Sequence, residues 1–303
     1  MDFKFFDDPL GTYEKEELRA VVAGDFEDEA GTRVVKIADG IEEIAENAFR
    51  NFESLEEIYI PSSVKKISAA AFYGCKNLKR VVMSEGILEI LDEAFSSCPS
   101  LASVEIPDSC TRIGEGAFEG CASLGFVKLP EGIKMIGASA FAFCFNLREI
   151  SIPDSCVLVE FSAFASCFAL ERARLSEGMR LVDESLFEGC RSLKEVELPS
   201  GLIKIGRRAF KDCASLSDII LPESLAGIGF DAFYGCSSLR RVCLPKSLAE
   251  IEDADAFGAC DSLREISFGG SRKAWEYLTG GRALTVQRSD LSVTVPKISF
   301  LDL

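Results

Sequence analysis

The stretch DAFYGCSSLRRVCLPKSLAEI (residues 231–251) holds one unit of a repeat that runs along most of the chain. Its phenylalanine, Phe233, has equivalents at a constant spacing of 23 residues on its N-terminal side. These equivalents are Phe49, Phe72, Phe95, Phe118, Phe141, Phe164, Phe187 and Phe210, and the next one, Phe257, follows after 24 residues. Because one short unit cannot bury its apolar face alone, the repeat predicts a stack of similar coils that share a core.

Each unit also contains a short stretch in which apolar and polar residues alternate. The segments LEEIYIP (55–61) and LKEVELP (193–199) are examples. Alternation at period two predicts a short strand, with Ile58 and Ile60 facing inward. The rest of the unit, such as IGEGAFEGCASL (113–124), is too short for a long helix and predicts a turn with one or two helical turns. We therefore expect one strand per coil, beginning with a degenerate strand near residues 34–37.

Ten copies of the Phe–Leu core of this unit, over residues 41–268, resemble the BspA-like leucine-rich repeat, which pairs A-F-x-x-C-x-x-L with I-x-L-P. The segment ISFGGSRKAWEYL (266–278) resembles the G-x-x-x-x-W ending that follows the last coil in such proteins. The resemblance implies an α/β solenoid. Its expected form is a right-handed leucine-rich repeat horseshoe with a parallel concave sheet, short helical or 3₁₀ turns on the convex side, and a cap at both ends.

The expected domain organisation is a single leucine-rich repeat domain over residues 1–303. Residues 1–32 form the N-terminal cap, residues 33–268 the repeats and residues 269–303 the C-terminal cap. A solenoid must cover its open ends. We expect Phe3, Phe5 and Phe6 to cover the first coil, and the segments ALTVQ (283–287) and LSVTVPKISFLDL (291–303) to close the last one with one or two strands.

The chain contains twelve cysteines, and the repeat accounts for most of them. Nine lie three residues after a repeat phenylalanine: Cys75, Cys98, Cys121, Cys144, Cys167, Cys190, Cys213, Cys236 and Cys260. Phe52 holds this place in the first copy, and a place that accepts Cys or Phe is predicted to face inward. Cys110 and Cys156 replace core aliphatic residues. Neighbouring thiols are close enough for disulfides, but the side chains of stacked coils point in the same direction and not toward each other, so we predict that the cysteines are reduced. Cys243 falls on an outward strand position and is the predicted exposed thiol.

Composition excludes several functions. The chain has 33 Lys and Arg against 49 Asp and Glu, a net charge of −16, so nucleic acid and anionic lipid are unsuitable partners. It has no histidine, so Ser-His-Asp and Cys-His catalysis and histidine zinc sites are excluded. The acidic cluster of Glu250, Glu252, Asp253 and Asp255 is predicted to be a solvated turn. We predict no enzyme, no catalytic residue, no cofactor and no metal.

The N-terminal segment MDFKFFDDPLGTYEKEEL has no basic region followed by an apolar stretch, so we predict no signal peptide in it. No run of about 18 apolar residues is present, so membrane insertion is not expected. The family resemblance implies a bacterial cell-surface or secreted protein, whereas the missing signal favours the cytoplasm. Localisation stays open between the two.

Two patches are candidate binding sites. Outward strand positions place Phe126, Lys128, Ser151, Arg172 and Arg174 on three successive strands, as an aromatic and cationic patch for a protein partner. The alternative interpretation is structural: Glu149 and Glu195 neutralise Arg172, and Phe126 merely packs over Lys128. The second patch, Phe143, Phe145, Phe161 and Phe168, is either an exposed contact surface or a filling of the volume left by Ala173.

The predicted function is a non-enzymatic protein-binding scaffold. The resemblance implies an adhesin-type module of the bacterial cell surface, with a host or bacterial surface protein as partner. The alternative is a structural spacer or a cytoplasmic interaction protein. We expect the chain to be a monomer.

Overall fold

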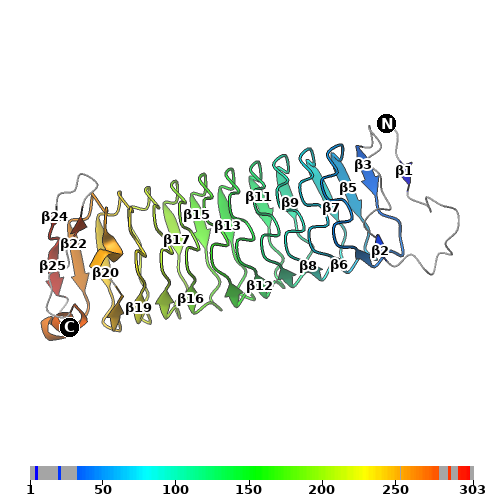
Figure 1. The fold of residues 1–303 in the computed structure, drawn as a ribbon. Coiled ribbons are helices and arrows are strands. Elements are labelled where there is room, and N and C mark those ends of the chain that lie inside the picture. The colour runs from blue at the N-terminus through cyan, green and yellow to red at the C-terminus, as the bar shows by residue number, and fades with distance from the viewer. Residues whose placement is uncertain are drawn as a thin grey trace. The chain divides into compact units, whose positions relative to one another are not determined.

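The computed structural model describes residues 4–5, 20–21, 33–252, 254–279, 286–287 and 293–300. The chain divides into two compact units, Met1–Leu147 and Arg148–Leu303. Within each unit, consecutive coils lie side by side and pair through parallel strands (Figure 1). The fold is therefore a stacked parallel solenoid with few helices, as the repeat predicted.

The first set of strands, called here the long-strand row, lies at the alternating segments. In the first unit it comprises β3 (Val34–Lys36), β5 (Glu57–Ile60), β7 (Arg80–Met83), β9 (Ser103–Glu105) and β11 (Phe126–Lys128), with β1 (Lys4–Phe5) beside β3. In the second unit it comprises β13 (Glu149–Ser151), β15 (Arg172–Arg174), β17 (Glu195–Glu197), β20 (Arg241–Leu244), β22 (Glu265–Phe268) and β25 (Lys297–Phe300). Ile58 and Ile60 are buried, as the alternation predicted, while Glu57 and Tyr59 are half-buried.

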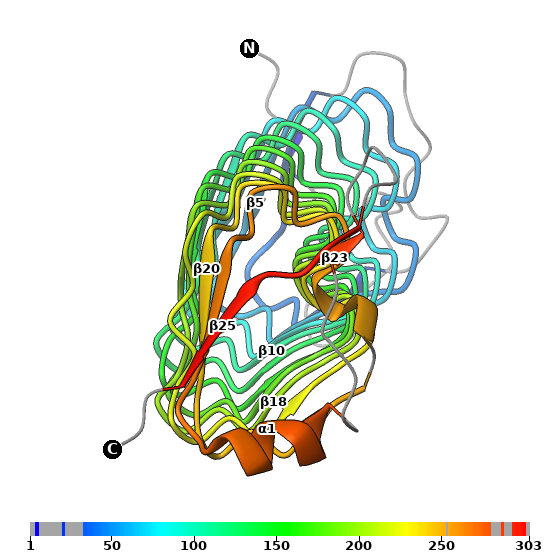
Figure 2. The same cartoon turned by 90° about the vertical axis from the view of Figure 1, so that its left-hand side faces the viewer.

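The prediction of one strand per coil was wrong, because each unit contains a second, short-strand row (Figure 2). In the first unit it comprises β2 (Ala20–Val21), β4 (Glu43–Ile44), β6 (Lys66–Ile67), β8 (Glu89–Ile90), β10 (Arg112–Ile113) and β12 (Met135–Ile136). In the second unit it comprises β14 (Leu158–Val159), β16 (Leu181–Val182), β18 (Lys204–Ile205), β19 (Gly227–Ile228) and β21 (Glu250–Ile251). Two residues are too few to show a period-two pattern, so these strands cannot be recognised from the sequence.

The prediction of helical turns around each repeat phenylalanine was also wrong for residues 33–252, where the structure has turns and no helix. The residues two places before and two places after the phenylalanine have positive φ, as Ala70 (52°) and Gly74 (71°) do around Phe72. Left-handed residues interrupt a helix. Their N–H groups instead donate to the next coil, from Ala70 to Asp92 O at 2.9 Å and from Gly74 to Ser96 O at 2.9 Å.

A 3₁₀ helix is nevertheless present where the repeat carries its extra residue. This is η1 (Ala254–Phe257), which leads into the last phenylalanine of the array. The single α-helix among the described residues, α1 (Arg272–Leu278), follows the last coil and is capped by the Ser271 hydroxyl, which accepts from Ala274 N. Among the described residues, helical structure is therefore confined to the irregular end of the repeats.

The core of each unit consists of ordered columns of equivalent side chains. Repeat phenylalanines stack almost parallel, with ring centroids 4.9 Å apart for Phe72 and Phe95 and 5.4 Å apart for Phe210 and Phe233. The leucine six residues behind each phenylalanine is buried as well, and so is the cysteine between them. Burial of these large apolar side chains supplies the main stabilising free energy of the stack.

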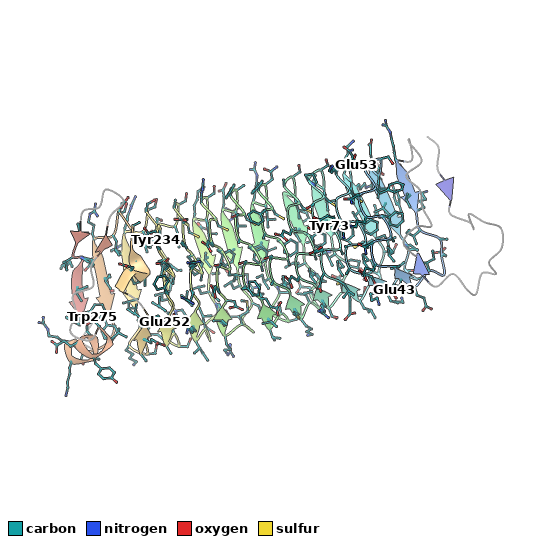
Figure 3. The ribbon with its side chains drawn as sticks, viewed as in Figure 1. Glu43, Glu53, Tyr73, Tyr234, Glu252 and Trp275 are labelled. Carbon is teal, nitrogen blue, oxygen red and sulfur yellow. The ribbon has the colours of Figure 1, made fainter. Side chains whose placement is uncertain are left out.

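The C-terminal part of the chain extends the second unit. Strand β25 pairs in parallel with β22, and Trp275 of α1 is buried against Phe268, with ring centroids 5.5 Å apart (Figure 3). Strands β23 (Val286–Gln287) and β24 (Val293–Thr294) pair antiparallel. The side chains of Phe3, Phe5 and Phe6 lie outside the described residues. Both caps, the horseshoe curvature and the single domain therefore stay predictions.

Candidate functional site

In the first unit, the outer face of the long-strand row carries the predicted residues Phe126 and Lys128. Both belong to β11 and are exposed, on either side of the buried Val127. Because side chains alternate along a strand, burying Val127 turns its two neighbours outward. Phe126 lies in register with Ser103 and Lys128 with Glu105. An aromatic ring that is 47% exposed therefore stands beside an opposite-charge pair.

In the second unit, Ser151, Arg172 and Arg174 lie on the adjacent strands β13 and β15. Arg172 is in register with Glu149 and forms an ion pair with it, with 3.5 Å between Nη2 and Oε2. Ser151 is in register with Arg174. The structure thus places a carboxylate next to Arg172, as the structural interpretation expected. Such exposed pairs contribute little to stability.

Arg174 is more firmly held than Arg172. Its Nη2 donates to both carboxylate oxygens of Asp154, at 2.9 and 3.1 Å, and its Nη1 donates to the Ile152 carbonyl oxygen at 3.2 Å. Hydrogen bonds from the Glu177 N–H and from Arg174 lower the pKa of Asp154. Asp154 was not predicted as a partner of Arg174, because it lies 20 residues before Arg174 and outside the 23-residue register.

The predicted five-residue patch therefore consists of two groups. Phe126 and Lys128 belong to the first unit, and Ser151, Arg172 and Arg174 belong to the second. The second predicted patch divides in the same way. Phe143 and Phe145 form an edge-to-face pair with centroids 6.3 Å apart in the first unit, and Phe161 and Phe168 are exposed in the second. The Arg191 guanidinium lies over the Phe168 ring, 5.0 Å from its centroid.

Phe143 has an unusual backbone conformation for a bulky residue, with φ at 60°. The equivalent residues of other coils include Gly74 and Gly120. A large side chain in the left-handed region costs roughly 1 kcal/mol. This strain at an exposed aromatic residue separates Phe143 from the other members of the second patch.

One exposed apolar position was not singled out from the sequence. Ile220 is 87% exposed and forms an isolated parallel bridge with Cys243, where the long-strand row of the second unit has no regular strand. Ile219 and Leu221 on either side are buried. The alternation of the segment LSDIILP (216–222) contains this signal, because its second isoleucine, Ile220, falls on an outward position.

The cysteines are all free thiols, and Cys243 is the one that is exposed. The array thiols donate to a phenylalanine carbonyl of the preceding coil, as Cys75 Sγ does to Phe49 O at 3.1 Å. Burial raises the pKa of the Cys121 thiol to about 12 and that of Cys110 to about 11. Buried thiols that keep their protons are poor nucleophiles and poor metal ligands.

In the part of the chain that the structure describes, no three Cys, Asp or Glu side chains gather closely enough to hold a metal ion. Nor do the described residues contain a helix that is long and apolar enough to cross a membrane. Within the predicted acidic turn, Glu252 pairs with Lys204 at 2.7 Å (Figure 3), and Asp253 lies outside the described residues.

Parallel coils of constant length, built around columns of Phe, Leu and Cys, define a solenoid protein of the leucine-rich repeat class. Residues 42–171 and 157–277 match the family model of the BspA type leucine rich repeat region. The chain therefore belongs to the BspA-type leucine-rich repeat family.

Solved structures to which the chain is similar include three bacterial leucine-rich repeat proteins. A leucine rich cell surface protein from Faecalibacterium prausnitzii A2-165 is 29% identical, with 81% of each chain covered and a TM-score of 0.44. The T. pallidum leucine rich repeat protein is 28% identical, with 68% of this chain and 77% of that chain covered and a TM-score of 0.45. A leucine-rich repeat protein from Bacteroides ovatus ATCC 8483 is 23% identical, with 89% and 92% covered and a TM-score of 0.44. No curated protein matches the chain.

Proposed function

We propose that the chain is a non-enzymatic protein-binding scaffold that uses the outward side chains of its long-strand rows. Leucine-rich repeat domains generally mediate protein–protein interactions, and membership of this family is consistent with a scaffold. The observation that carries the proposal is the exposure of Phe126. This residue is 47% exposed on a strand whose neighbouring outward residues are polar. An aromatic side chain kept out of the core in this way is available to a partner.

The chemistry of the surface favours a partner with exposed charges of both signs. In the first unit Phe126 offers a large apolar contact next to Lys128 and Glu105. In the second unit Arg172 is paired with Glu149. Long-strand rows with outward charges bind a partner with complementary charges and repel one with like charges. They therefore contribute more to specificity than to affinity. Aromatic and arginine side chains are also enriched among binding hot spots.

The finer proposal is an adhesin-type module of a bacterial surface, whose partner is a host or bacterial surface protein. The second patch, with the strained Phe143 beside Phe145, is the alternative contact on the first unit. The alternative function is a structural spacer that holds other modules apart. A spacer needs no exposed aromatic side chain at Phe126, which favours the binding function.

The experiment is a screen of the purified chain against an array of purified bacterial and host surface proteins, followed by affinity measurements on each hit. Phe126→Ala and Arg172→Glu test the two long-strand rows, and Phe143→Ser tests the second patch. Leu88→Ala is the matched control, because Leu88 is exposed but precedes β8 of the short-strand row. We expect at least one hit to weaken about ten-fold in a long-strand variant and to keep its affinity in the control. Hits that none of the three variants weakens would contradict the binding surface, and a screen without hits would favour the spacer.

A further inference from the structure

A group of exposed apolar side chains lies on the short-strand row of the second unit, away from the long-strand row. It consists of Val157, Leu158, Phe161, Leu181 and Ile203, which we call the short-strand patch. Val157 is 63% exposed and Phe161 is 51% exposed. Figure 2 shows that the two rows of the second unit, marked by β18 and β20, run along different sides of the coils. The short-strand patch is thus separate from the long-strand rows of the proposed function, and it shares only Phe161 with the second predicted patch.

The members of the short-strand patch come from consecutive coils that are bonded to each other. The Ser176 hydroxyl donates to Cys156 O at 2.6 Å, and the Ser162 N–H donates to Glu184 O at 2.9 Å. Leu158 and Leu181 lie between these two contacts, at equivalent positions of β14 and β16. The Ile203 N–H donates to Arg180 O at 2.8 Å, which joins the next coil to the same group. The exposed apolar side chains therefore lie at matching places of consecutive coils.

This surface is unusual for its position in the repeat. In the first unit, the first residue of the short strand is charged in four coils, at Glu43, Lys66, Glu89 and Arg112, and is Met135 in β12. A charged residue at this place keeps the outer face of the row in contact with water. Replacing it by leucine in two successive coils leaves apolar surface in contact with water. Contiguous exposed apolar patches on soluble proteins mark interaction sites.

The charges around the short-strand patch are mainly negative. Residues 157–161 and 180–184 contain Glu160, Asp183 and Glu184 against Arg180. The Arg180 guanidinium is already hydrogen-bonded to the carbonyl oxygens of Glu177 and Met179, at 3.2 and 3.3 Å. Glu184 is exposed to solvent at the edge of the patch. An apolar centre with an acidic edge complements a segment that is apolar on one side and basic on its flanks.

The cations of the following coil do not outweigh the negative charge around the short-strand patch. Lys204, in register with Leu181, forms an ion pair with Glu252 at 2.7 Å. Arg207 lies over the Phe230 ring, 5.6 Å from its centroid. Both side chains contact residues of later coils. A second copy of the chain is a poor occupant, because each copy carries a net charge of −16 and the two would repel.

We propose that the short-strand patch binds a basic amphipathic segment of a protein partner. The apolar side of the segment covers Leu158 and Leu181, and its Lys or Arg side chains face Asp183 and Glu184. Binding removes the apolar surface from water and leaves the charges at the wetter edge, which is the usual arrangement of an interface. The inference concerns a surface on which the proposed function does not depend.

The test uses a designed amphipathic peptide of leucine and lysine, labelled for fluorescence anisotropy and titrated with the whole chain. A peptide of the same pattern with glutamate in place of lysine is the charge control. Leu158→Ser combined with Leu181→Ser removes the centre of the short-strand patch without changing any charge. Leu88→Ser is the matched control, because it removes an exposed leucine beside a short strand of the first unit. Circular dichroism verifies the fold of each variant, and Val157→Ser with Phe161→Ser replaces the first pair if that pair misfolds.

The expected result is that the lysine peptide binds the unchanged chain and the Leu88→Ser variant equally, and binds the double variant at least about ten-fold more weakly. Glu184→Lys should also weaken the lysine peptide, whereas Phe126→Ala should not affect it. Equal binding of the lysine peptide to the double variant would overturn the proposal, because attraction to the acidic chain alone would then explain it. Tighter binding of the glutamate peptide, or a dimer that the double variant abolishes in sedimentation, would overturn the proposed partner.

Discussion

The thiol of Cys121 donates a hydrogen bond to the carbonyl oxygen of Phe95, with 3.2 Å between sulfur and oxygen. The same contact joins Cys98 to Phe72 and Cys213 to Phe187. Each of these cysteines therefore fills a place in the core and also bonds its coil to the preceding one. A hydrophobic residue of similar size would fill the space but could not donate to the buried carbonyl.

This contact predicts the cost of changing Cys121. Cys121→Ala removes the donor and leaves a small void, so we expect the free energy of unfolding to fall by about 1–2 kcal/mol. Urea denaturation measures the loss, with a reducing agent present throughout. Cys243→Ala is the control and should change the free energy by less than about 0.5 kcal/mol, because Cys243 is exposed. Equal effects of the two substitutions would show that the contact is not stabilising.

Thiol accessibility gives a second prediction. A thiol reagent at neutral pH should modify about one cysteine quickly in the folded chain, because the nucleophile is an exposed thiolate and only Cys243 is exposed. Denaturation should make all twelve cysteines reactive. Mass spectrometry after short labelling identifies the modified residue, and Cys243→Ser should remove the fast phase. Several fast thiols in that variant would contradict the burial of the array.

Alkaline pH should destabilise the chain. Burial raises the pKa of the Cys121 thiol to about 12, and burial is also the largest cause that raises the pKa of Cys260 to about 12. An unfolded cysteine ionises near pH 8.5, so above this pH the unfolded chain has lost protons that the folded chain keeps. The stabilisation is complete below pH 8.5 and is lost as pH rises toward 12, at roughly 1 kcal/mol per pH unit for each such thiol.

Urea midpoints measured between pH 7 and pH 11 check this dependence. Lysine and tyrosine side chains also titrate in this range, so the Cys121→Ala variant serves as the reference. Its free energy of unfolding should fall less steeply with pH than that of the unchanged chain. A midpoint that stays constant up to pH 11 would show that the buried thiols ionise without unfolding.

Replacing a stacked phenylalanine should be costly in either unit. Phe118 is stacked on Phe141 at 5.2 Å, and Phe210 on Phe233 at 5.4 Å. Phe118→Ala and Phe210→Ala should each lower the free energy of unfolding by about 3–5 kcal/mol, because each leaves a cavity. If the chain folds as a single domain, as predicted, both variants should shift the same thermal transition. Calorimetry that shows two transitions, each moved by one variant, would contradict the single domain.

The left-handed residues allow a matched pair of substitutions. Gly120 and Phe143 hold equivalent places with φ at 70° and 60°. A Cβ at Gly120 would approach Ser97 no closer than 3.8 Å, so Gly120→Ala introduces no clash. We expect this substitution to lower the free energy of unfolding by about 1 kcal/mol, the cost of a left-handed backbone for a residue with a Cβ. Phe143→Gly should stabilise the chain by relieving the same penalty. Thermal melting compares the two, and stabilisation by Gly120→Ala would contradict this account.

Much of the fold follows from the repeat itself. The spacing of Phe72, Phe95 and Phe118 identifies the coil length, and the alternation at Ile58 and Ile60 locates a strand. These signals are readable because burial imposes the same residue type at the same place in every coil. The short strands are different, since the two residues Lys66 and Ile67 form a strand only because the neighbouring coils hold matching residues beside them.

The candidate sites were less predictable. Exposure of Phe126 follows from its place in the alternation, but the partner of Arg174 does not. Asp154 reaches Arg174 from a different place in the preceding coil, and no periodic pattern relates the two residues. The short-strand patch escaped notice for a similar reason, because Leu158 and Leu181 look like ordinary core residues until the strand direction is known.

The coil length, the columns of Phe, Leu and Cys, the long strands and the family can be read from the amino-acid sequence, because each depends on residues that repeat in register. The short-strand row, the left-handed turns in place of helices and the hydrogen-bond partners of the thiols and of Arg174 become visible only in the folded chain. These features arise from bonds between coils, which are distant in sequence. A backbone conformation such as that of Ala70 is favourable only when its N–H meets the carbonyl oxygen of Asp92 in the next coil, and residue type alone does not encode that contact.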